Sequence, residues 1–201
     1  MIRPALLLAI GLLLAPAAQG QQDKPFHKVV DAFLINAPIK MNYHYTIARG
    51  NFRQDTSGTL VLIGPGVFRL ELWDKVYGSD GSSLYLHDRN THQTVIDSLR
   101  WTEVNLWVRL LHGELPARTV VTPCESTSKG ATCWELSHEE PWWQGVVETD
   151  TTTWAIREIL LHEEPEWQHL VRLDIPEPWN NANPDSFIAL EDLPGTRLDL
   201  R

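Results

Sequence analysis

The stretch GTLVLIGPGVFRLELW, residues 58–73, is the most regular pattern in this chain of 201 residues. Its second half alternates apolar and charged side chains: Phe68, Arg69, Leu70, Glu71 and Leu72. Side chains on a β-strand point alternately to its two faces. The pattern therefore predicts a strand with a dry face formed by the apolar residues and a wet face that carries Arg69 and Glu71.

Three more apolar runs rich in strand-forming residues surround this strand, at residues 59–63, 84–87 and 93–96. Turn-forming sequences separate the runs: Gly64-Pro65-Gly66, Ser79-Asp80-Gly81-Ser82 and Asp88-Arg89-Asn90. Four strands joined by short turns predict an antiparallel meander with one buried face. The fold class is therefore expected to be mainly β.

The order of these motifs resembles the outer-membrane lipoprotein carrier (LolA) family. The motifs are a Gly-x-Leu strand at 58–60, a Pro-x-x-Phe-Arg strand opening at 65–69, and Ser-Asp-Gly before a Leu-Tyr strand at 79–85. The end of the chain, with Phe187 to Leu190, Leu193-Pro194-Gly195 and a short strand at 196–200, is similar to the family's ending. The resemblance implies a strongly curved antiparallel sheet, an incomplete β-barrel, lidded by short helices.

Residues 1–20 are predicted to be a cleaved signal peptide. Arg3 precedes an apolar run at 5–15, and small residues at 18–20 suit cleavage. The run is shorter than the roughly 20 residues that a spanning helix needs, although an uncleaved anchor is the alternative. No cysteine follows the run, which excludes lipid modification there. Residues 21–201 are expected to form a single domain, soluble in the periplasm.

Two segments have the periodicity of amphipathic helices. Residues 25–37 place one apolar stripe along a helix that ends before Pro38, and residues 101–112 place another along a helix that Gly113 can end. The resemblance implies that the second helix forms part of the lid. Between them, residues 39–47 alternate as a strand, with Tyr43 and Tyr45 on one face. Further strands are predicted at 118–123, 132–137, 146–150, 154–162 and 167–175.

The only cysteines, Cys124 and Cys133, flank the loop of the predicted hairpin. In an exported chain such a pair predicts a disulfide, which would stabilise the fold by roughly 2–3 kcal/mol in the chain-entropy model. A redox pair is the alternative, but the Cys-x-x-Cys spacing is missing. The eight histidines are scattered without the paired spacing of a zinc site.

Charge and motifs exclude several function classes. A net charge of -9 argues against binding to nucleic acid and against electrostatic binding to anionic lipid surfaces. The sequence contains no Gly-x-Ser-x-Gly, no Gly-rich phosphate loop and no His-Glu-x-x-His. Asp80-Gly81 is better explained as a turn than as a catalytic site. We therefore expect a binding protein that is not an enzyme and that needs no cofactor or metal.

The chain contains nine tryptophans, which is an unusually large number of bulky apolar side chains. Each one alone fits a core or half-exposed position. Together they suggest that two short helices fill the hollow of a curved sheet incompletely, which leaves a dry cavity for apolar ligands. The predicted lining is Phe33, Tyr43, Phe68, Leu70, Leu72, Leu84, Leu86, Trp107, Leu110 and Leu111. Each of these could instead be ordinary core packing.

By resemblance, the protein is a periplasmic carrier that shields the acyl chains of lipoproteins and delivers them toward the outer membrane. Its expected partners are acylated lipoproteins, an inner-membrane lipoprotein-releasing transporter and an outer-membrane acceptor, and it is expected to be a monomer. The alternatives are a periplasmic sensor or regulator, or a carrier of another lipid, on the same fold. In the family an arginine before the strand-opening proline holds the lid; Gly64 stands there in this chain, which predicts a less firmly closed lid.

Overall fold

The computed structural model describes residues 24–126, 128–139, 142–163, 166–181 and 183–201, so the predicted signal peptide lies outside the described residues. The elements in chain order are α1 (Lys24–Leu34), β1 (Ile39–Arg49), β2 (Phe52–Gly64), β3 (Val67–Leu72), β4 (Lys75–Asp80), β5 (Ser83–Asp88), β6 (Gln93–Ser98), the 3₁₀ turn η1 (Trp101–Glu103), α2 (Leu106–Leu111), β7 (Val120–Cys124), β8 (Ala131–Glu139), β9 (Trp142–Asp150), β10 (Ile156–Glu163), β11 (Trp167–Leu173), β12 (Glu177–Pro178), α3 (Pro184–Ile188) and β13 (Thr196–Asp199).

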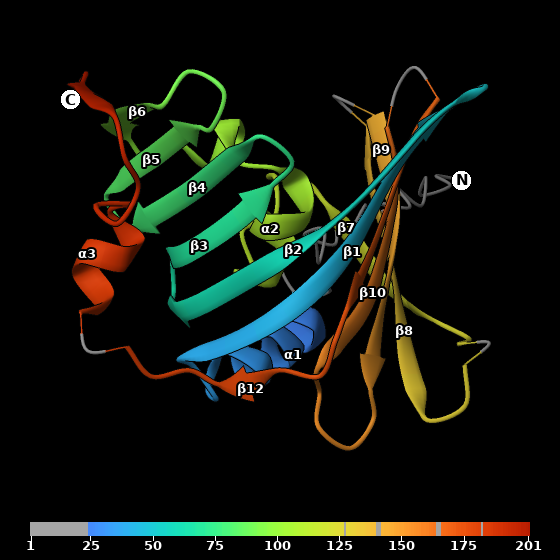
Figure 1. The fold of residues 1–201 in the computed structure, drawn as a ribbon. Helices are drawn as coiled ribbons and strands as arrows, with labels where there is room; N and C mark the ends of the chain where they lie inside the picture. The colour runs from blue at the N-terminus through green and yellow to red at the C-terminus, as the bar shows by residue number, and fades with distance from the viewer. Residues whose placement is uncertain (1–23, 127, 140–141, 164–165, 182) are drawn as a thin grey trace, which may run out of the picture.

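Within the described residues, 13 strands form one sheet in the order β13-β6-β5-β4-β3-β2-β1-β11-β10-β9-β8-β7, and β12 pairs with the start of β1. β13 runs parallel to β6, whereas the other neighbours are antiparallel. The sheet curves strongly, and the two strands at the ends of this order, β13 and β7, are not paired with each other (Figure 1). The predicted incomplete β-barrel is confirmed.

β1 connects the two halves of the sheet. It pairs with β2 along its whole length, from Ile39 opposite Leu62 to Arg49 opposite Phe52, and with β11 along its other edge. The predicted alternation is confirmed, because Tyr43 and the other odd-numbered residues at the start of β1 are buried while their even-numbered neighbours are exposed. This face of β1 therefore belongs to the interior.

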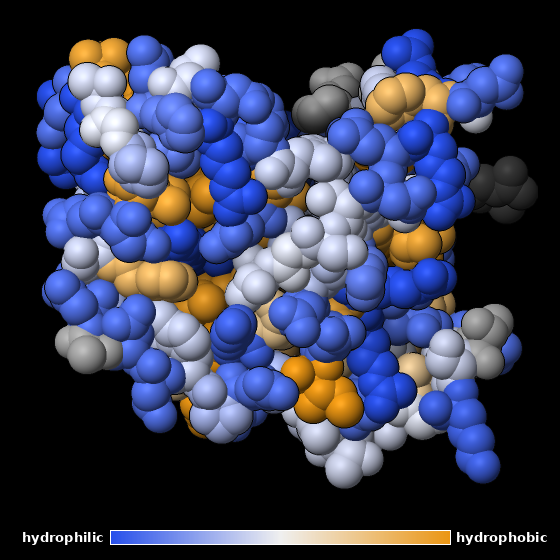
Figure 2. Space-filling view, viewed as in Figure 1, coloured by the Kyte–Doolittle hydropathy of each residue, from blue (hydrophilic) through white to orange (hydrophobic). Residues whose placement is uncertain are grey.

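The core lies on the concave side of the sheet, under α1 and α2 (Figure 1). Its largest fully buried side chains come from both helices and from the strands: Trp107, Tyr43, Phe26, Phe33 and Phe68. On the side of the molecule turned toward the viewer in Figure 2, most residues are hydrophilic and the apolar ones form small separate patches. The apolar surface of the sheet is therefore largely turned inward.

The opposite face of β3 and β4 is covered by the C-terminal segment. Arg69 is only 4% exposed, and its guanidinium stacks over the Phe187 ring of α3 at 4.1 Å. Gly78 allows α3 to approach, since a Cβ there would meet the carbonyl oxygen of Ile188. The prediction of a wet face at Arg69 is therefore wrong: alternation separates the two faces correctly, but α3 buries the second one.

Three elements of the structure differ from the prediction. β4 was missed, since Gly78 and Ser79 weaken its strand pattern. The helix predicted at 101–112 is divided, because Val104 and Asn105 have extended ψ angles of 141° and 132°. α3, which contains Phe187, was not predicted.

The hairpin of β7 and β8 contains both cysteines of the chain. Cys124 lies opposite Cys133 in the strand register, with a Cα–Cα distance of 5.0 Å, and the two form a disulfide. The predicted pairing is confirmed. The disulfide fixes the end of β7, which is the last strand on this side of the sheet.

Candidate functional site

The structure brings nine of the ten predicted lining residues into one apolar cluster on the concave side. They are Phe33, Tyr43, Phe68, Leu70, Leu72, Leu84, Trp107, Leu110 and Leu111. Leu86 is half-buried and does not belong to the cluster. The cluster also contains residues that the sequence did not single out, among them Tyr45, Trp134 and Val147. We call this cluster the interior.

Helix α2 supplies the middle of the interior. Trp107 is fully buried, and its ring lies 5.5 Å from that of Tyr43 and 6.2 Å from that of Tyr45. α1 covers another part, where Phe26 packs edge-on against Trp134 at 6.2 Å. Both helices thus pack against the sheet through aromatic side chains, which form large apolar contacts.

The end of α2 contacts the loop between β2 and β3. The backbone N–H of Gly66 donates a hydrogen bond to Nδ1 of His112 at 3.3 Å, and the imidazole packs against the rings of Phe68 and Trp101. Burial lowers the pKa of His112 to about 4, so the ring is neutral at neutral pH and can accept this bond. Near Gly64, the Gly66 amide thus makes a hydrogen bond with the end of α2, and the less firmly closed lid that Gly64 predicts stays a prediction.

A polar group lies among the aromatic rings at the other end of α2. The hydroxyl of Tyr45 is 2.6 Å from Nδ1 of His169, and the two rings stack with centroids 6.0 Å apart. The side chain of Asn105, the residue before α2, also interacts with this hydroxyl and lowers its pKa, although burial raises the pKa more. Nε2 of His169 lies 3.7 Å from a carboxylate oxygen of Glu163. The surroundings of the Tyr45 hydroxyl thus combine residues from β1, β10, β11 and the start of α2.

Two buried nitrogen atoms beside Tyr45 have no hydrogen-bond partner. They are Nε1 of Trp107 and Nε2 of His169, and they are two of six such side-chain atoms within the described ranges. A buried donor left unpaired costs about 1–3 kcal/mol. The interior is therefore apolar in bulk but has unused hydrogen-bonding capacity at this point.

Two further features of the described part of the chain are the grouping of its His, Cys, Asp and Glu side chains and the length of its helices. No three His, Cys, Asp or Glu side chains are grouped there as metal ligands. No helix there is long and apolar enough to cross a membrane. The candidate site is the interior together with its two polar contacts to α2.

Comparison with known structures identifies this arrangement. The crystal structure of a LolA superfamily protein from Nitrosomonas europaea matches 86% of this chain and 99% of that chain, with a TM-score of 0.50 and 7% identity. The fold is LolA-like. At this identity the likeness concerns the fold and not the function. The match covers most of the chain, as the order of the sequence motifs predicted.

Two further solved structures match this chain with lower scores. A DUF1329 family protein from Desulfovibrio piger matches with a TM-score of 0.41 and 6% identity, covering 86% of this chain and 99% of that one. A Vibrio parahaemolyticus domain, proposed to act in outer-membrane lipoprotein sorting, has a TM-score of 0.41 and 5% identity and covers 85% and 99%. No family model and no curated protein matches the sequence.

Sequence reasoning missed the polar residues of the site. Tyr45 was placed on the correct face by the alternation in β1, and His169 shares the face of Val171 and Leu173 in β11, but a single histidine on that face was given no role. The two residues are 124 positions apart and meet only through the β1–β11 register. His112 was included in the predicted helix but had no assigned role, since its partner is a backbone amide.

Proposed function

We propose that the protein is a periplasmic carrier that holds the acyl chains of lipoproteins in the interior and delivers them toward the outer membrane. The acyl chains would exchange one apolar environment for another, and each buried methylene contributes about 0.8 kcal/mol. The partners in this proposal are acylated lipoproteins, an inner-membrane transporter that releases them and an outer-membrane acceptor. The mechanism is binding without chemical conversion.

The observation that carries this proposal is the way α2 covers the sheet. Trp107, Leu110 and Leu111 are fully buried against the concave face, and the polar contacts at the two ends of the helix join neutral groups. Apolar contacts of this kind can be replaced by acyl chains with little loss, because lipid tails offer the same surface. The LolA-like fold supports the same proposal.

A charge placed in the interior tests the binding step. Phe68 is 1% exposed and Phe52, on the neighbouring strand β2, is 49% exposed. Phe68→Glu should abolish binding of a fluorescent fatty acid, because an ionised carboxylate is costly to bury. Phe52→Glu makes the same chemical change at the surface and should bind as the parent does. Fluorescence titration with circular dichroism as a folding check measures both, and equal effects would refute the assignment of Phe68.

The cargo is tested by native mass spectrometry of the protein purified from its own host. Bound lipoprotein that carries acyl chains supports the carrier proposal. A bound free lipid would replace it with the carrier of another lipid. Titration of the emptied protein with a purified acylated lipoprotein separates an unloaded carrier, which binds, from a protein that does not take this cargo.

A further inference from the structure

The side chains of Tyr45 and His169 each have a defined protonation state. Burial lowers the pKa of His169, although the charge of Glu163 raises it, and burial raises the pKa of Tyr45 to about 12. Both side chains are therefore uncharged at neutral pH. With the Tyr45 hydroxyl donating to Nδ1 across 2.6 Å, the hydrogen of the neutral imidazole lies on Nε2. Nε2 of His169 is then a donor.

The rings that carry this donor and the indole N–H of Trp107 both lie beside the ring of Tyr45. The centroid of the Tyr45 ring is 6.0 Å from that of His169 and 6.2 Å from that of Trp107. Trp107 is completely buried, and neither nitrogen has a hydrogen-bond partner within the described ranges. The carboxylate of Glu163 is 3.7 Å from His169 Nε2, beyond hydrogen-bond distance. Two buried donors without an acceptor are thus carried by the two rings next to Tyr45.

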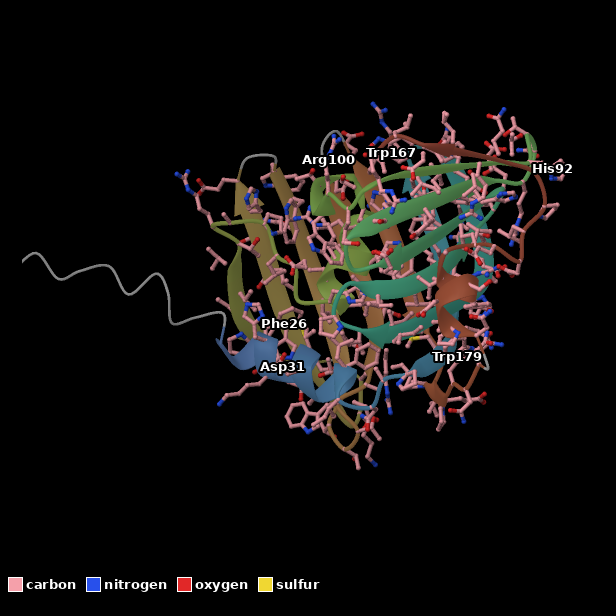
Figure 3. All side chains as sticks on the ribbon, turned by 90° about the vertical axis from the view of Figure 1, so that its left-hand side faces the viewer. Phe26, Asp31, His92, Arg100, Trp167 and Trp179 are labelled. Atoms are coloured by element: carbon pink, nitrogen blue, oxygen red, sulfur yellow. A yellow bond between two sulfur atoms is a disulfide. The ribbon has the colours of Figure 1, made fainter. Side chains whose placement is uncertain are left out.

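The group lies where the interior ends. Along β1 the inward-facing residues are buried up to Tyr45 and only partly buried from Ile47 onward. α1 lies at the lower end of the sheet and Trp167, at the start of β11, at the upper end (Figure 3). His169 is two residues from Trp167, so this group is on the side away from α1. An acylated molecule with its chains in the interior would place the start of each chain near this position.

We propose that the N–H groups of Trp107 and His169 form a binding site for the carbonyl oxygens of an acylated ligand. These are the ester or amide groups that join acyl chains to a polar head. A carbonyl oxygen accepts hydrogen bonds and donates none, which matches two donors without an acceptor. This site rests on the proposed carrier function and adds to it a preference for acyl chains over plain hydrocarbon chains.

A matched pair of ligands tests the site on the whole protein. Dioctanoylglycerol has two ester carbonyls, and dioctylglycerol is its ether counterpart with chains of the same length. Both are titrated calorimetrically into the parent protein. The ester should bind about three- to tenfold more tightly, the range expected for one or two net hydrogen bonds.

Two tryptophan variants localise the preference. Trp107→Phe keeps an aromatic ring but removes one of the two N–H groups, and should lower the ester-to-ether ratio clearly below that of the parent. Trp134→Phe is the control, because Nε1 of Trp134 is also buried and unpaired but its ring packs against Phe26 of α1. This control should keep the ratio of the parent. A preserved ratio in Trp107→Phe, or an equal loss in both variants, would overturn the site.

The outcomes separate the site from the carrier function. If ester and ether bind the parent equally, the carrier function stands and the carbonyl site is wrong. If neither ligand binds, the carrier function fails and the site fails with it. Should Trp107→Phe not fold, nitrogen NMR of the labelled parent decides. The Trp107 indole N–H signal should move downfield with the ester and not with the ether, and an identical response to both ligands contradicts the proposal.

Discussion

The two faces of the sheet are covered in different ways. On the convex face, the guanidinium of Arg69 donates to the carbonyl oxygen of Phe187 at 2.9 Å and to the carboxylate of Asp192 at 2.7 Å. Arg197 donates to the carbonyl oxygens of Ala189 and Leu190, the residues that follow α3, and β13 adds a strand beside β6. On the concave face, α2 is held by apolar side chains and by polar contacts between neutral groups.

This difference indicates which cover can move. Charge-assisted hydrogen bonds in a buried setting are strong and directional, and nothing in a lipid would replace them. Apolar contacts are not directional, and an acyl chain can replace those that Leu110 and Leu111 at the end of α2 make with the sheet. We therefore interpret α3 as a fixed cover and α2 as an exchangeable one.

Removal of the Arg69 guanidinium should loosen the fixed cover. Arg69→Met keeps much of the side-chain volume but loses the hydrogen bonds to Phe187 and Asp192. Hydrogen bonds of a charged group contribute about 1.5–3 kcal/mol, and the exposure of Asp192 reduces the ion-pair part. We expect the free energy of unfolding in urea to fall by about 2–3 kcal/mol.

A surface arginine gives the matched control for this change. Arg53 pairs with Asp55 at 2.9 Å, but both side chains are mostly exposed. Arg53→Met should leave the stability close to that of the parent, because exposed ion pairs contribute little. If the two variants lose equal stability, the contacts of Arg69 do not fasten α3 more firmly than an ordinary surface pair would.

Acid should loosen the exchangeable cover. The pKa of His112 is about 4 in the closed structure against an ordinary value of 6.5. Below pH 6.5 the open or unfolded chain therefore binds more protons, and the closed state loses stability as the pH falls from about 6.5 to about 4. Between pH 7 and pH 5 the loss should be about 2 kcal/mol. Hydrogen exchange should accelerate at α2 more than at α3, after correction for intrinsic rates.

His112→Gln separates this effect from other histidines with a lowered pKa, such as His87 and His169. Glutamine can accept the hydrogen bond from the Gly66 amide but does not titrate. The variant should therefore keep α2 protected at pH 5. If its exchange still accelerates as in the parent, the titration of His112 does not control this helix.

An arginine at position 64 should tighten the exchangeable cover. Gly64 lies outside the left-handed region of the backbone, and a Cβ there would meet no atom within 4 Å. In Gly64→Arg, new hydrogen bonds to carbonyls near the end of α2 would favour the closed state and weaken binding of a fluorescent lipid by up to about tenfold. Gly64→Gln is the uncharged control. A folded arginine variant that binds as well as the parent would show that position 64 does not govern the lid.

Alternation in the sequence predicted the strands and their faces but not what covers each face. Phe68 and Leu70 were correctly assigned to one side of β3 and Arg69 to the other. Arg69 is buried by a segment 118 residues further along the chain. A local sequence pattern cannot predict a contact between residues so far apart in the sequence. β4 was missed for a related reason, since Gly78 is small because the carbonyl oxygen of Ile188 approaches it.

The candidate site was predictable only in its apolar part. Periodicity assigned Trp107 to the buried side of its helix and Tyr43 to the buried side of β1, because apolar residues repeat at the spacing of the element. His112 and His169 are single polar residues whose burial depends on partners from other elements. His112 contacts a backbone amide, and His169 meets Tyr45 through the pairing of β1 with β11. Neither contact can be predicted from the neighbouring residues in the sequence.

The two ends of the sheet have a consequence for association between copies of the chain. An exposed edge strand can pair with an edge of a neighbouring molecule and so begin aggregation. β7 is short, and Pro123 within it has no N–H to donate, while the Cys124–Cys133 disulfide anchors its end. At the other edge, β13 has four residues, among them the charged Arg197 and Asp199. A sheet that never closes on itself thus ends in two strands that are poor templates for a neighbour.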